Sequence, residues 1–294
     1  MLEIAAPPLK YYTTIKLGGP ALALLKPEHP EELGLLEEKA AQWGGDLMPI
    51  GRGSNLLATD GQLPLILVSL ERIQGIEIIK REGGKIKISA YAGTPLPRLL
   101  RFCLKNGFTG LEGLAGIPGS VGGACAMNAG SFGTTIGAHV EAIYAWNGRE
   151  ICLFEKESLS FGYRSLKIKN IKQIPIITRI ILTLTEAPKS VIFASMNLNF
   201  LNKKSRQPIT AYSAGCTFKN PSDAPAAGQL LEQAGLRGYR LGGMEFSRKH
   251  ANFLVNTGTG TGFQALELID KASEAVWKCA GIRLEPEIRI LSWQ

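Results

Sequence analysis

One glycine-dense stretch, residues 107–137, constrains this chain more than any other feature. Glycine occurs there at positions 107, 110, 113, 116, 119 and 122, at every third residue. A collagen-like triplet run is disfavoured because the stretch is short, its other positions are mostly apolar and Pro118 is its only proline. A flexible linker is disfavoured as well, since a linker would leave those apolar side chains in water.

The pattern instead favours backbone that lies close against a large, partly anionic ligand. Glycine removes the Cβ that blocks such an approach and permits positive φ, and successive exposed N–H groups can bind phosphate oxygens. A second stretch, Gly51-Arg-Gly-Ser-Asn-Leu56, has the same character and adds a cation. Neither stretch is a standard P-loop or dinucleotide fingerprint. Together they predict a nucleotide or dinucleotide cofactor.

Length and composition set the class of protein. With 294 residues, of which 45% are hydrophobic and 20% charged, the chain suits two or three globular domains. No apolar run approaches the roughly 20 residues of a membrane span. The N-terminus lacks the basic and apolar regions of a signal peptide. We therefore expect a cytoplasmic protein that does not associate with membranes.

The cysteines, the histidines and the net charge limit which metals, ligands and macromolecules the chain is expected to bind. The five cysteines (103, 125, 152, 216 and 279) are scattered and form no C-x-x-C, so we expect reduced thiols and no zinc site. The three histidines lie far apart in the sequence, and no metal is predicted. The net charge of +8 suits an anionic small molecule, or serves only solubility. Nucleic acid is not expected, because no long basic run alternates with aromatic residues. An obvious exposed apolar face is also missing, so we expect a monomer.

Apolar periodicity and turn signals predict the secondary structure. The predicted helices are Pro30–Trp43, Leu96–Asn106, Ser190–Asn202, Ala226–Ala234 and Gly262–Ala280. The second of these helices has Thr94 as its expected N-cap, and Gly107 and Gly281 are expected to end two of them. The predicted strands are Ala21–Leu25, Leu47–Ile50, Leu65–Ser69, Ile76–Lys80, Lys85–Tyr91, Val140–Trp146, Glu150–Phe154, Ile174–Leu184 and Glu287–Leu291.

Four short stretches combine polar residues in unusual ways: Gly51–Asn55, Ser160–Arg164, Ser213–Pro221 and Leu284–Arg289. The third places a thiol, an ammonium and an amide close together, as Cys216, Lys219 and Asn220. Each stretch alone also has an ordinary interpretation, such as a turn, a surface ion pair, a buried cysteine or the start of a strand.

Taken together, stretches along nearly the whole chain resemble one family, the UDP-N-acetylenolpyruvoylglucosamine reductases, which are FAD enzymes of bacterial peptidoglycan precursor synthesis. The stretches occur in the family's order and are Thr13–Pro20, Pro49–Leu56, Gly113–Ala124 with Asn128–Gly130, Phe161–Arg164, Ala214–Pro221, Lys249–Asn256 and Leu284–Arg289. The chain lacks a long extra tyrosine-bearing loop after Tyr163-Arg164, which suggests the shorter of the family's two types.

The resemblance implies an α+β fold. Two domains would form an FAD-binding fold of the vanillyl-alcohol-oxidase/PCMH type, and a C-terminal α+β domain would close over the substrate. The implied domains are residues 1–70 and 71–190 for FAD and 191–286 for the substrate, with a final strand at 287–294 that returns to the first domain as one alternative. The implied FAD-binding residues are Gly51, Arg52, Gly53, Ser54, Asn55, Leu56, Ala115, Gly116, Ile117, Pro118, Gly119, Ser120 and Val121.

The resemblance also implies the reaction. NADPH reduces FAD, a hydride then passes from flavin N5 to the double bond of UDP-N-acetylglucosamine enolpyruvate, and a proton completes UDP-N-acetylmuramate. Arg164 matches the family position that stabilises the developing negative charge. Glu287 matches that of a carboxylic acid kept protonated by burial so that it can donate a hydrogen bond. The implied substrate-binding residues are Tyr163, Arg206, Lys219 and Asn220.

Cys216 is a departure from the commoner motif, which has a serine as proton donor at this position. A thiol donates a proton readily, but a thiolate cannot, and Arg164 and Lys219 would favour the thiolate. We therefore expect that Cys216 is the donor and that burial keeps it neutral; the alternative is a small buried cysteine without a role. His250 has no acid near it in sequence and suits a structural role or a hydrogen bond, and Cys125 suits packing.

Two other functions stay open. One is a different flavin oxidase or dehydrogenase on the same scaffold, although such enzymes usually need no third domain with the Cys-Lys-Asn and Glu-Pro-Glu stretches. The other is a non-catalytic nucleotide-binding module. The presence of Arg164, Cys216 and Glu287 together argues against that module.

Overall fold

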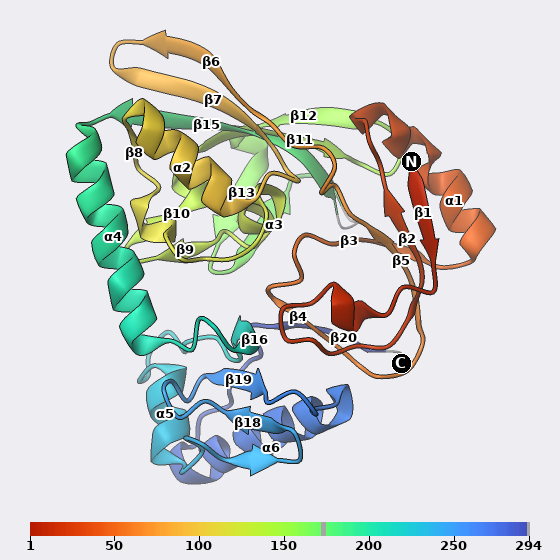
Figure 1. Ribbon diagram of the computed structural model, residues 1–294, viewed down its shortest axis with the longest axis vertical. Helices are drawn as coiled ribbons and strands as arrows, with labels where there is room; N and C mark the ends of the chain where they lie inside the picture. Colours follow the sequence, from red (N-terminus) through yellow and green to blue (C-terminus); the bar gives the residue numbers. More distant parts are fainter. Residues whose placement is uncertain (172–174, 293–294) are drawn as a thin grey trace. The chain divides into compact units, whose positions relative to one another are not determined.

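The computed structural model describes residues 1–171 and 175–292, which form a mixture of helices and strands (Figure 1). The chain folds into two compact units. Unit 1 comprises Met1–Ala5, Ala23–Arg52 and Leu65–Asn202, and unit 2 comprises Ala6–Leu22, Gly53–Pro64 and Lys203–Gln294. Among the described helices, none has the length and apolar character needed to cross a membrane.

Two sheets are built largely from unit 1 (Figure 1). The strands of the smaller sheet are β1 (Leu2–Ala5), β2 (Ala21–Lys26), β3 (Asp46–Pro49) and β5 (Leu63–Val68). They lie in the order β1-β2-β5-β3, with β1 antiparallel to β2 and β3 parallel to β5. The strands of the larger sheet are β6 (Ile76–Glu82), β7 (Lys85–Tyr91), β8 (Phe108–Thr109), β11 (Val140–Trp146), β12 (Ile151–Glu155) and β15 (Ile176–Glu186). They lie in the order β12-β11-β15-β7-β6, and β8 also pairs with β15.

Short elements complete unit 1. The helices are α1 (Leu36–Trp43), α2 (Leu96–Asn106) and α3 (Val121–Ala126), and α4 (Lys189–Arg206) begins there. Two small hairpins are formed by β9 (Gly130–Ser131) with β10 (Thr134–Thr135) and by β13 (Leu159–Gly162) with β14 (Ser165–Ile168). The predicted helix Ser190–Asn202 is confirmed within the longer α4. Ile174, the first residue of the predicted strand 174–184, lies outside the described residues.

The β11–β12 hairpin and α2 form where the sequence predicts them. The two strands pair in antiparallel register, and the Asn147 side-chain oxygen accepts hydrogen bonds from the amides of Arg149 and Glu150, at 2.9 and 3.0 Å. Helix α2 ends at Gly107, which adopts a φ of 75°. A residue without a Cβ reaches this left-handed conformation without strain, which is why the helix stops there.

Two predicted helix starts are wrong in detail. The helix predicted over Pro30–Trp43 begins as a 3₁₀ helix over Pro30–Leu35 and becomes α-helical only at Leu36. Gly34, a poor α-helix former, lies at this change. Thr94 does not cap α2, because Pro95 is the N-cap. The buried Thr94 hydroxyl instead donates to the carbonyl of Gly75 at 3.2 Å and accepts from its amide at 3.1 Å.

Unit 2 is organised around a four-stranded antiparallel sheet and two helices (Figure 1). The strands are β16 (Tyr212–Cys216), β17 (Arg240–Leu241), β18 (Met244–Phe246) and β19 (Phe253–Asn256), in the order β16-β19-β18-β17. The helices are α5 (Ala227–Gln233) and α6 (Gly262–Ala280). Both helices contribute buried side chains to the core of this unit, including Leu230, Leu231, Leu268, Ile269 and Val276.

Segments far apart in the sequence meet in unit 2. Strand β4 (Leu56–Ala58) pairs in parallel with β20 (Arg289–Leu291). The Asp60 carboxylate accepts hydrogen bonds from the amides of Gly262 and Phe263, at 2.9 and 3.1 Å, beside the capping box that begins α6. Residues 53–60 are therefore held against the C-terminal part of the chain, which positions the loop that precedes β4.

Candidate functional site

The two glycine-containing stretches predicted to bind phosphate meet within unit 1. Gly51 follows β3, and Ser120 directly precedes α3 and caps it by accepting a hydrogen bond from the Gly123 amide at 3.3 Å. A Cβ atom at Gly51 would lie only 2.6 Å from the Ser120 hydroxyl oxygen. A side chain at position 51 would therefore displace the Ser120 hydroxyl, so glycine here favours the close approach of the two stretches.

Backbone amides at this meeting point lack acceptors. Within the described part of the chain, the N–H groups of Gly51, Arg52, Gly119 and Ser120 donate no hydrogen bond. Gly119 and Ser120 are buried, and buried backbone N–H groups are almost always paired. An oxygen-rich anion such as a diphosphate would supply the missing acceptors. The residues at this point fit the phosphate groups of a dinucleotide cofactor.

The turn that carries these amides is fixed from both sides. Leu96 donates its amide hydrogen to the Gly119 carbonyl at 3.0 Å, and Val121 donates to the Thr94 carbonyl at 2.8 Å. Gly116 and Gly119 adopt φ values of 79° and 129°, which favour glycine. These hydrogen bonds and glycine conformations together define the shape of the turn.

Other glycines of the long stretch serve the packing of the protein itself. A Cβ atom at Gly113 would lie 2.5 Å from the Ser131 carbonyl oxygen, and one at Gly122 would lie 2.7 Å from the Ala92 Cβ. Gly110 likewise faces the His139 ring. The three-residue glycine repeat therefore has two causes, and within it only residues 116–120 point to a ligand.

Arg164 lies in unit 1, in the turn between β13 and β14. Its φ is 54°, a strained value for a residue with a long side chain. The guanidinium donates to the Gly130 carbonyl at 3.3 Å and lies 5.0 Å from the centre of the Tyr163 ring, which is itself exposed. The backbone conformation and these contacts hold the guanidinium of Arg164 in a defined position.

Asn128 explains how this turn is held, a role that the sequence did not reveal. Its side-chain amide donates to the Gly162 carbonyl at 2.9 Å, and its side-chain oxygen accepts from the Gly137 amide at 3.0 Å. Asn128 is buried and therefore links the glycine stretch to the hairpin that carries Arg164. Its place in the family-like stretch Asn128–Gly130 is the one signal that could have identified it.

Cys216 ends β16 in unit 2, next to Gly215, whose φ is 85°. Cys216 is half-buried. Cys125, by contrast, is fully buried, and burial raises the pKa of its thiol to about 12, as expected of a packing residue. In residues 1–171 and 175–292, no group of three or more His, Cys, Asp or Glu side chains is arranged to hold a metal ion.

The segment that contains Glu287 lies beside the residues that follow Cys216. The Glu287 amide donates to the Thr217 carbonyl, and the Lys219 amide donates to the Glu285 carbonyl, each at 2.8 Å. Phe218 and Pro286 form an antiparallel bridge between them. Two of the three predicted catalytic residues, Cys216 and Glu287, are therefore brought to neighbouring segments of unit 2, whereas Arg164 belongs to unit 1.

The Asn55 side chain reaches the same part of unit 2. Its amide nitrogen donates to the Glu287 carbonyl at 3.3 Å, and its backbone carbonyl accepts from the Arg289 amide at 3.0 Å. Gly53, two residues earlier, has a φ of 60°, and a Cβ there would collide with the Tyr12 carbonyl oxygen. Through Asn55, residues 53–56 of the predicted stretch are therefore hydrogen-bonded to the segment that contains Glu287.

Of the predicted substrate-binding residues, Lys219 and Asn220 make local contacts. Lys219 forms an exposed ion pair with Glu285, at 3.1 Å between Nζ and Oε2. The Asn220 side-chain oxygen accepts from the Ala227 amide at 3.0 Å, at the start of α5. Arg206 is the exposed last residue of α4.

Asn252 is a second buried residue whose role the sequence did not reveal. Its side-chain oxygen accepts from the Phe218 amide, and its side-chain nitrogen donates to the Phe218 carbonyl, both at 2.8 Å. Its backbone carbonyl accepts from the Thr217 amide at 2.7 Å. His250 supports Asn252, because its Nδ1 accepts from the Asn252 amide at 3.2 Å. These bonds hold the segment that follows Cys216.

His250 should make the stability of the protein sensitive to acid. Burial lowers the pKa of His250 below its usual value of 6.5, and the nearby Arg237 lowers it further while Glu232 opposes the shift. The folded state then binds fewer protons than the unfolded state, so the free energy of unfolding falls as pH drops through about 6.5. Because glutamine does not titrate, we expect His250→Gln to make this fall in the free energy of unfolding shallower. Urea unfolding between about pH 8 and pH 5 measures the slope for both proteins. An unchanged slope in the variant would contradict the assignment.

Gly51→Ala tests the meeting of the two glycine stretches. The new methyl group should displace the Ser120 hydroxyl from the Gly123 amide, which costs roughly 1 kcal/mol as a lost helix cap, and should weaken FAD binding by disturbing the adjacent amides. Gly34→Ala is the matched control, since a Cβ at Gly34 meets no atom within 4 Å. Titration of the apoprotein with FAD measures both affinities. Equal FAD affinity in the two variants would argue against a cofactor at this point.

Two family models and several known proteins match this chain. The family model described as "FAD binding domain" matches residues 21–147, and the model described as "UDP-N-acetylenolpyruvoylglucosamine reductase, C-terminal domain" matches residues 207–291. A UDP-N-acetylenolpyruvoylglucosamine reductase from Nitratidesulfovibrio vulgaris is 41% identical over 100% of both chains. One from Aquifex aeolicus is 34% identical over 99% of this chain and 96% of its own.

A solved structure agrees with these relatives. The crystal structure of UDP-N-acetylenolpyruvylglucosamine reductase from Thermus caldophilus matches with a TM-score of 0.82 and 33% identity, over 98% of each chain. The predicted α+β class, with an FAD-binding domain and a separate C-terminal domain, is confirmed. The chain belongs to the family of UDP-N-acetylenolpyruvoylglucosamine reductases.

Proposed function

We propose that this chain is an FAD-dependent oxidoreductase that reduces UDP-N-acetylglucosamine enolpyruvate to UDP-N-acetylmuramate, with NADPH as electron donor, in peptidoglycan precursor synthesis. Its full-length match to reductases of this name is the observation that carries the proposal. The unpaired amides of Gly51, Arg52, Gly119 and Ser120 support an anionic cofactor. We further propose that the enzyme works in the cytoplasm as a monomer.

The cofactor would be held by the chain's own backbone. Bound FAD would supply the hydride for the substrate. The amides of residues 51–52 and 119–120 would bind its diphosphate, together with the neighbouring residues 53–56 and 115–118 and Val121. We keep the assignment of residues 1–70 and 71–190 to FAD and of 191–286 to the substrate as part of this proposal.

Three side chains would act on the enolpyruvyl group. Hydride addition to its double bond builds negative charge on the neighbouring carbon and the carboxylate. The fixed guanidinium of Arg164 would stabilise that charge. Glu287, which matches the family position for a carboxylic acid, would hydrogen-bond the same developing negative charge. Cys216 would then transfer its Sγ proton to the carbon and recover a proton from solvent.

The remaining proposed residues would bind the rest of the substrate. Arg206 and Lys219 are exposed cations that suit the diphosphate. Tyr163 offers an exposed ring beside Arg164, and Asn220 offers its amide at the start of α5. These roles concern binding, so substitutions here should raise KM more than they lower kcat.

A turnover assay tests the proposal. Enzyme loaded with FAD should oxidise NADPH only when UDP-N-acetylglucosamine enolpyruvate is present, and mass spectrometry should find a product heavier by two hydrogens. Omission of FAD is the control. NADPH oxidation that depends on oxygen and leaves the UDP-sugar unchanged would favour a different flavin oxidase. Binding of the UDP-sugar by protein that never takes up FAD would favour a non-catalytic module.

A further inference from the structure

Cys216, the proposed proton donor, follows an irregularity in strand β16. Ser213 lies opposite Val255 of β19 and Cys216 lies opposite Phe253, so three steps along β16 match two steps along β19. One extra residue in a strand is a β-bulge, and it changes the face of the sheet to which the following side chains point. Gly215, inside the bulge, has a φ of 85°, a left-handed value that favours glycine. The direction of the Cys216 side chain therefore depends on this bulge.

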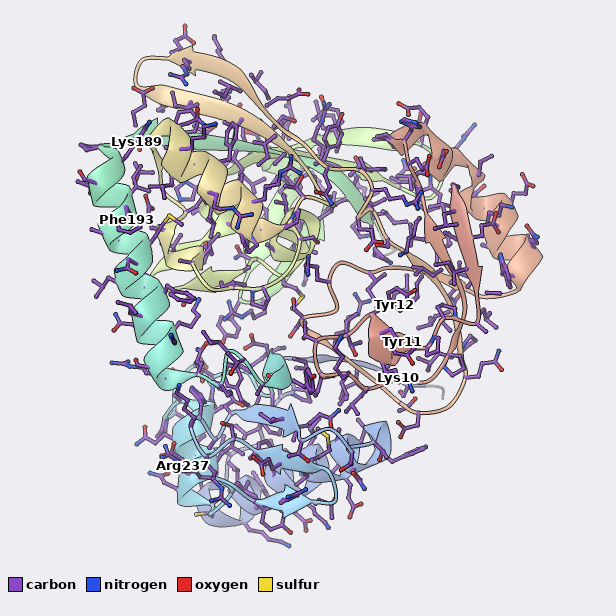
Figure 2. The ribbon with its side chains drawn as sticks, in the orientation of Figure 1. Lys10, Tyr11, Tyr12, Lys189, Phe193 and Arg237 are labelled. Atoms are coloured by element: carbon purple, nitrogen blue, oxygen red, sulfur yellow. The ribbon has the colours of Figure 1, made fainter. Side chains whose placement is uncertain are left out.

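Two hydroxyl groups hold the start of the bulge. The Ser213 hydroxyl oxygen accepts a hydrogen bond from the Gly215 amide at 3.1 Å. The Thr14 hydroxyl donates to the Ser213 carbonyl at 2.7 Å, although the two residues are 199 positions apart in the sequence. Thr14 comes just after Tyr11 and Tyr12, which are labelled in Figure 2. All of these residues belong to unit 2.

Thr14 also contacts the predicted FAD-binding stretch. Its amide donates to the Gly53 carbonyl at 3.1 Å. Its hydroxyl oxygen lies 3.3 Å from the same carbonyl oxygen, but a hydroxyl has only one hydrogen, and the shorter distance favours Ser213 as its acceptor. A Cβ atom at Gly215 would lie 3.9 Å from the Ser54 carbonyl oxygen, so the bulge itself lies against this stretch. Loss of the Thr14 hydroxyl would therefore release the bulge while the Thr14 amide still holds Gly53.

We propose that Thr14, together with Ser213, is a positioning residue for the proton transfer from Cys216. The two hydroxyl groups fix the bulge, and the bulge fixes the direction of the Cys216 Sγ atom toward the substrate carbon. This inference rests on the proposed function, because the proton transfer belongs to that function. Placement matters because a displacement of about 1 Å can lower the rate of a reaction by about 10²-fold.

Thr14→Val removes the hydroxyl and nearly preserves the shape of the side chain. Single-turnover mixing of prereduced, FAD-loaded enzyme with UDP-N-acetylglucosamine enolpyruvate measures the effect. We expect the variant to reduce the substrate about 10- to 10²-fold more slowly than wild type. Thr14→Ser keeps a hydroxyl and should retain most of the wild-type rate. Reduction of the flavin by NADPH should be unchanged in both variants, since Cys216 takes no part in that step.

Thr257→Val is the matched control. The Thr257 amide and hydroxyl both donate to the Gly243 carbonyl, each at 2.9 Å, so this threonine of unit 2 makes the same kind of contact and has no proposed role. The control variant should reduce the substrate at the wild-type rate. Equal losses of rate in Thr14→Val and Thr257→Val would show that both reflect a general loss of stability, and the proposal would be wrong.

A double-mutant comparison tests whether Thr14 acts through Cys216. Cys216→Ala has no thiol proton to position, so adding Thr14→Val should not slow this variant any further. A second loss of the same factor would show that Thr14 acts independently of Cys216 and would overturn the proposal. If Thr14→Val does not fold, Ser213→Ala, which removes the acceptor of the Gly215 amide, takes its place in the same comparison.

Alkylation of the thiols separates this proposal from the proposed function. FAD-loaded protein without substrate is treated with iodoacetamide, and mass spectrometry follows the modification of Cys216 and Cys152, which are both half-buried. A released bulge should expose the Cys216 thiol, so Thr14→Val should raise its alkylation rate by at least about threefold and leave that of Cys152 unchanged.

The two failures then look different. An unchanged alkylation rate at Cys216 would contradict the positioning role, whatever the enzyme reduces. Faster alkylation at Cys216, in a protein whose wild type never reduces the UDP-sugar, would contradict the proposed function and still support the attachment of the bulge to Thr14.

Discussion

Cys216→Ala is expected to slow reduction of the enolpyruvyl substrate by about 10²- to 10⁴-fold, the usual contribution of a positioned general acid. Cys216→Ser restores a proton donor at the same position and should retain most of the rate. Because the thiol acts only on substrate, reduction of the bound flavin by NADPH should be unchanged in both variants. Single-turnover mixing of prereduced enzyme with substrate, followed by flavin absorbance, measures the step directly.

The control for Cys216 is another half-buried cysteine, Cys152, which accepts a hydrogen bond from the Asn147 side chain at 3.2 Å and has no proposed role. Cys152→Ala should reduce substrate at the wild-type rate. If Cys216→Ala does so as well, Cys216 is a packing residue and the proton comes from another group.

Arg164→Met should lower the rate of substrate reduction by about 10²- to 10³-fold, the magnitude found when one donor to a developing oxyanion is removed. Arg164→Lys keeps the charge but loses the planar fork, so its rate should lie between those of wild type and Arg164→Met. All three side chains bear the same strain at a φ of 54°, so the comparison isolates the guanidinium. Rapid mixing of prereduced enzyme with substrate measures all three rates.

Arg179 provides a matched control for Arg164. It also lies in unit 1 and stacks on an aromatic ring, 4.1 Å from the centre of Tyr144, but it has no proposed contact with substrate. Arg179→Met should leave the reduction rate near that of wild type. Equal losses in Arg164→Met and Arg179→Met, accompanied by equal losses of thermal stability, would assign both arginines to the fold.

Local signals predicted much of the secondary structure. Gly107 and Gly281 end α2 and α6 with φ values of 75° and 68°, because only a residue without a Cβ adopts these conformations freely. The predicted helix cap at Thr94 is wrong because the Thr94 hydroxyl makes its hydrogen bonds to the backbone of Gly75, nineteen residues earlier in the chain. The sheet of unit 2 was missed because its strands are two to five residues long, too short to show a period of two.

The site was predictable where it consists of local motifs. The sequence singled out Gly51 and residues 115–121 separately, but only the structure shows that Gly51 meets Ser120. Asn128 and Asn252 were missed because their side chains bond to residues 34 positions away. Such contacts depend on how the chain returns on itself, which no local pattern specifies.

An anaerobic half-reaction experiment tests the central claim most directly. The protein, loaded with FAD, is reduced with NADPH in the absence of oxygen, and UDP-N-acetylglucosamine enolpyruvate is then added while the flavin absorbance band is followed. The proposed function predicts that the band bleaches with NADPH and returns with the substrate. A band that bleaches and stays bleached would contradict the proposed substrate, and protein that binds no FAD at all would contradict the cofactor site built on Gly51 and Ser120.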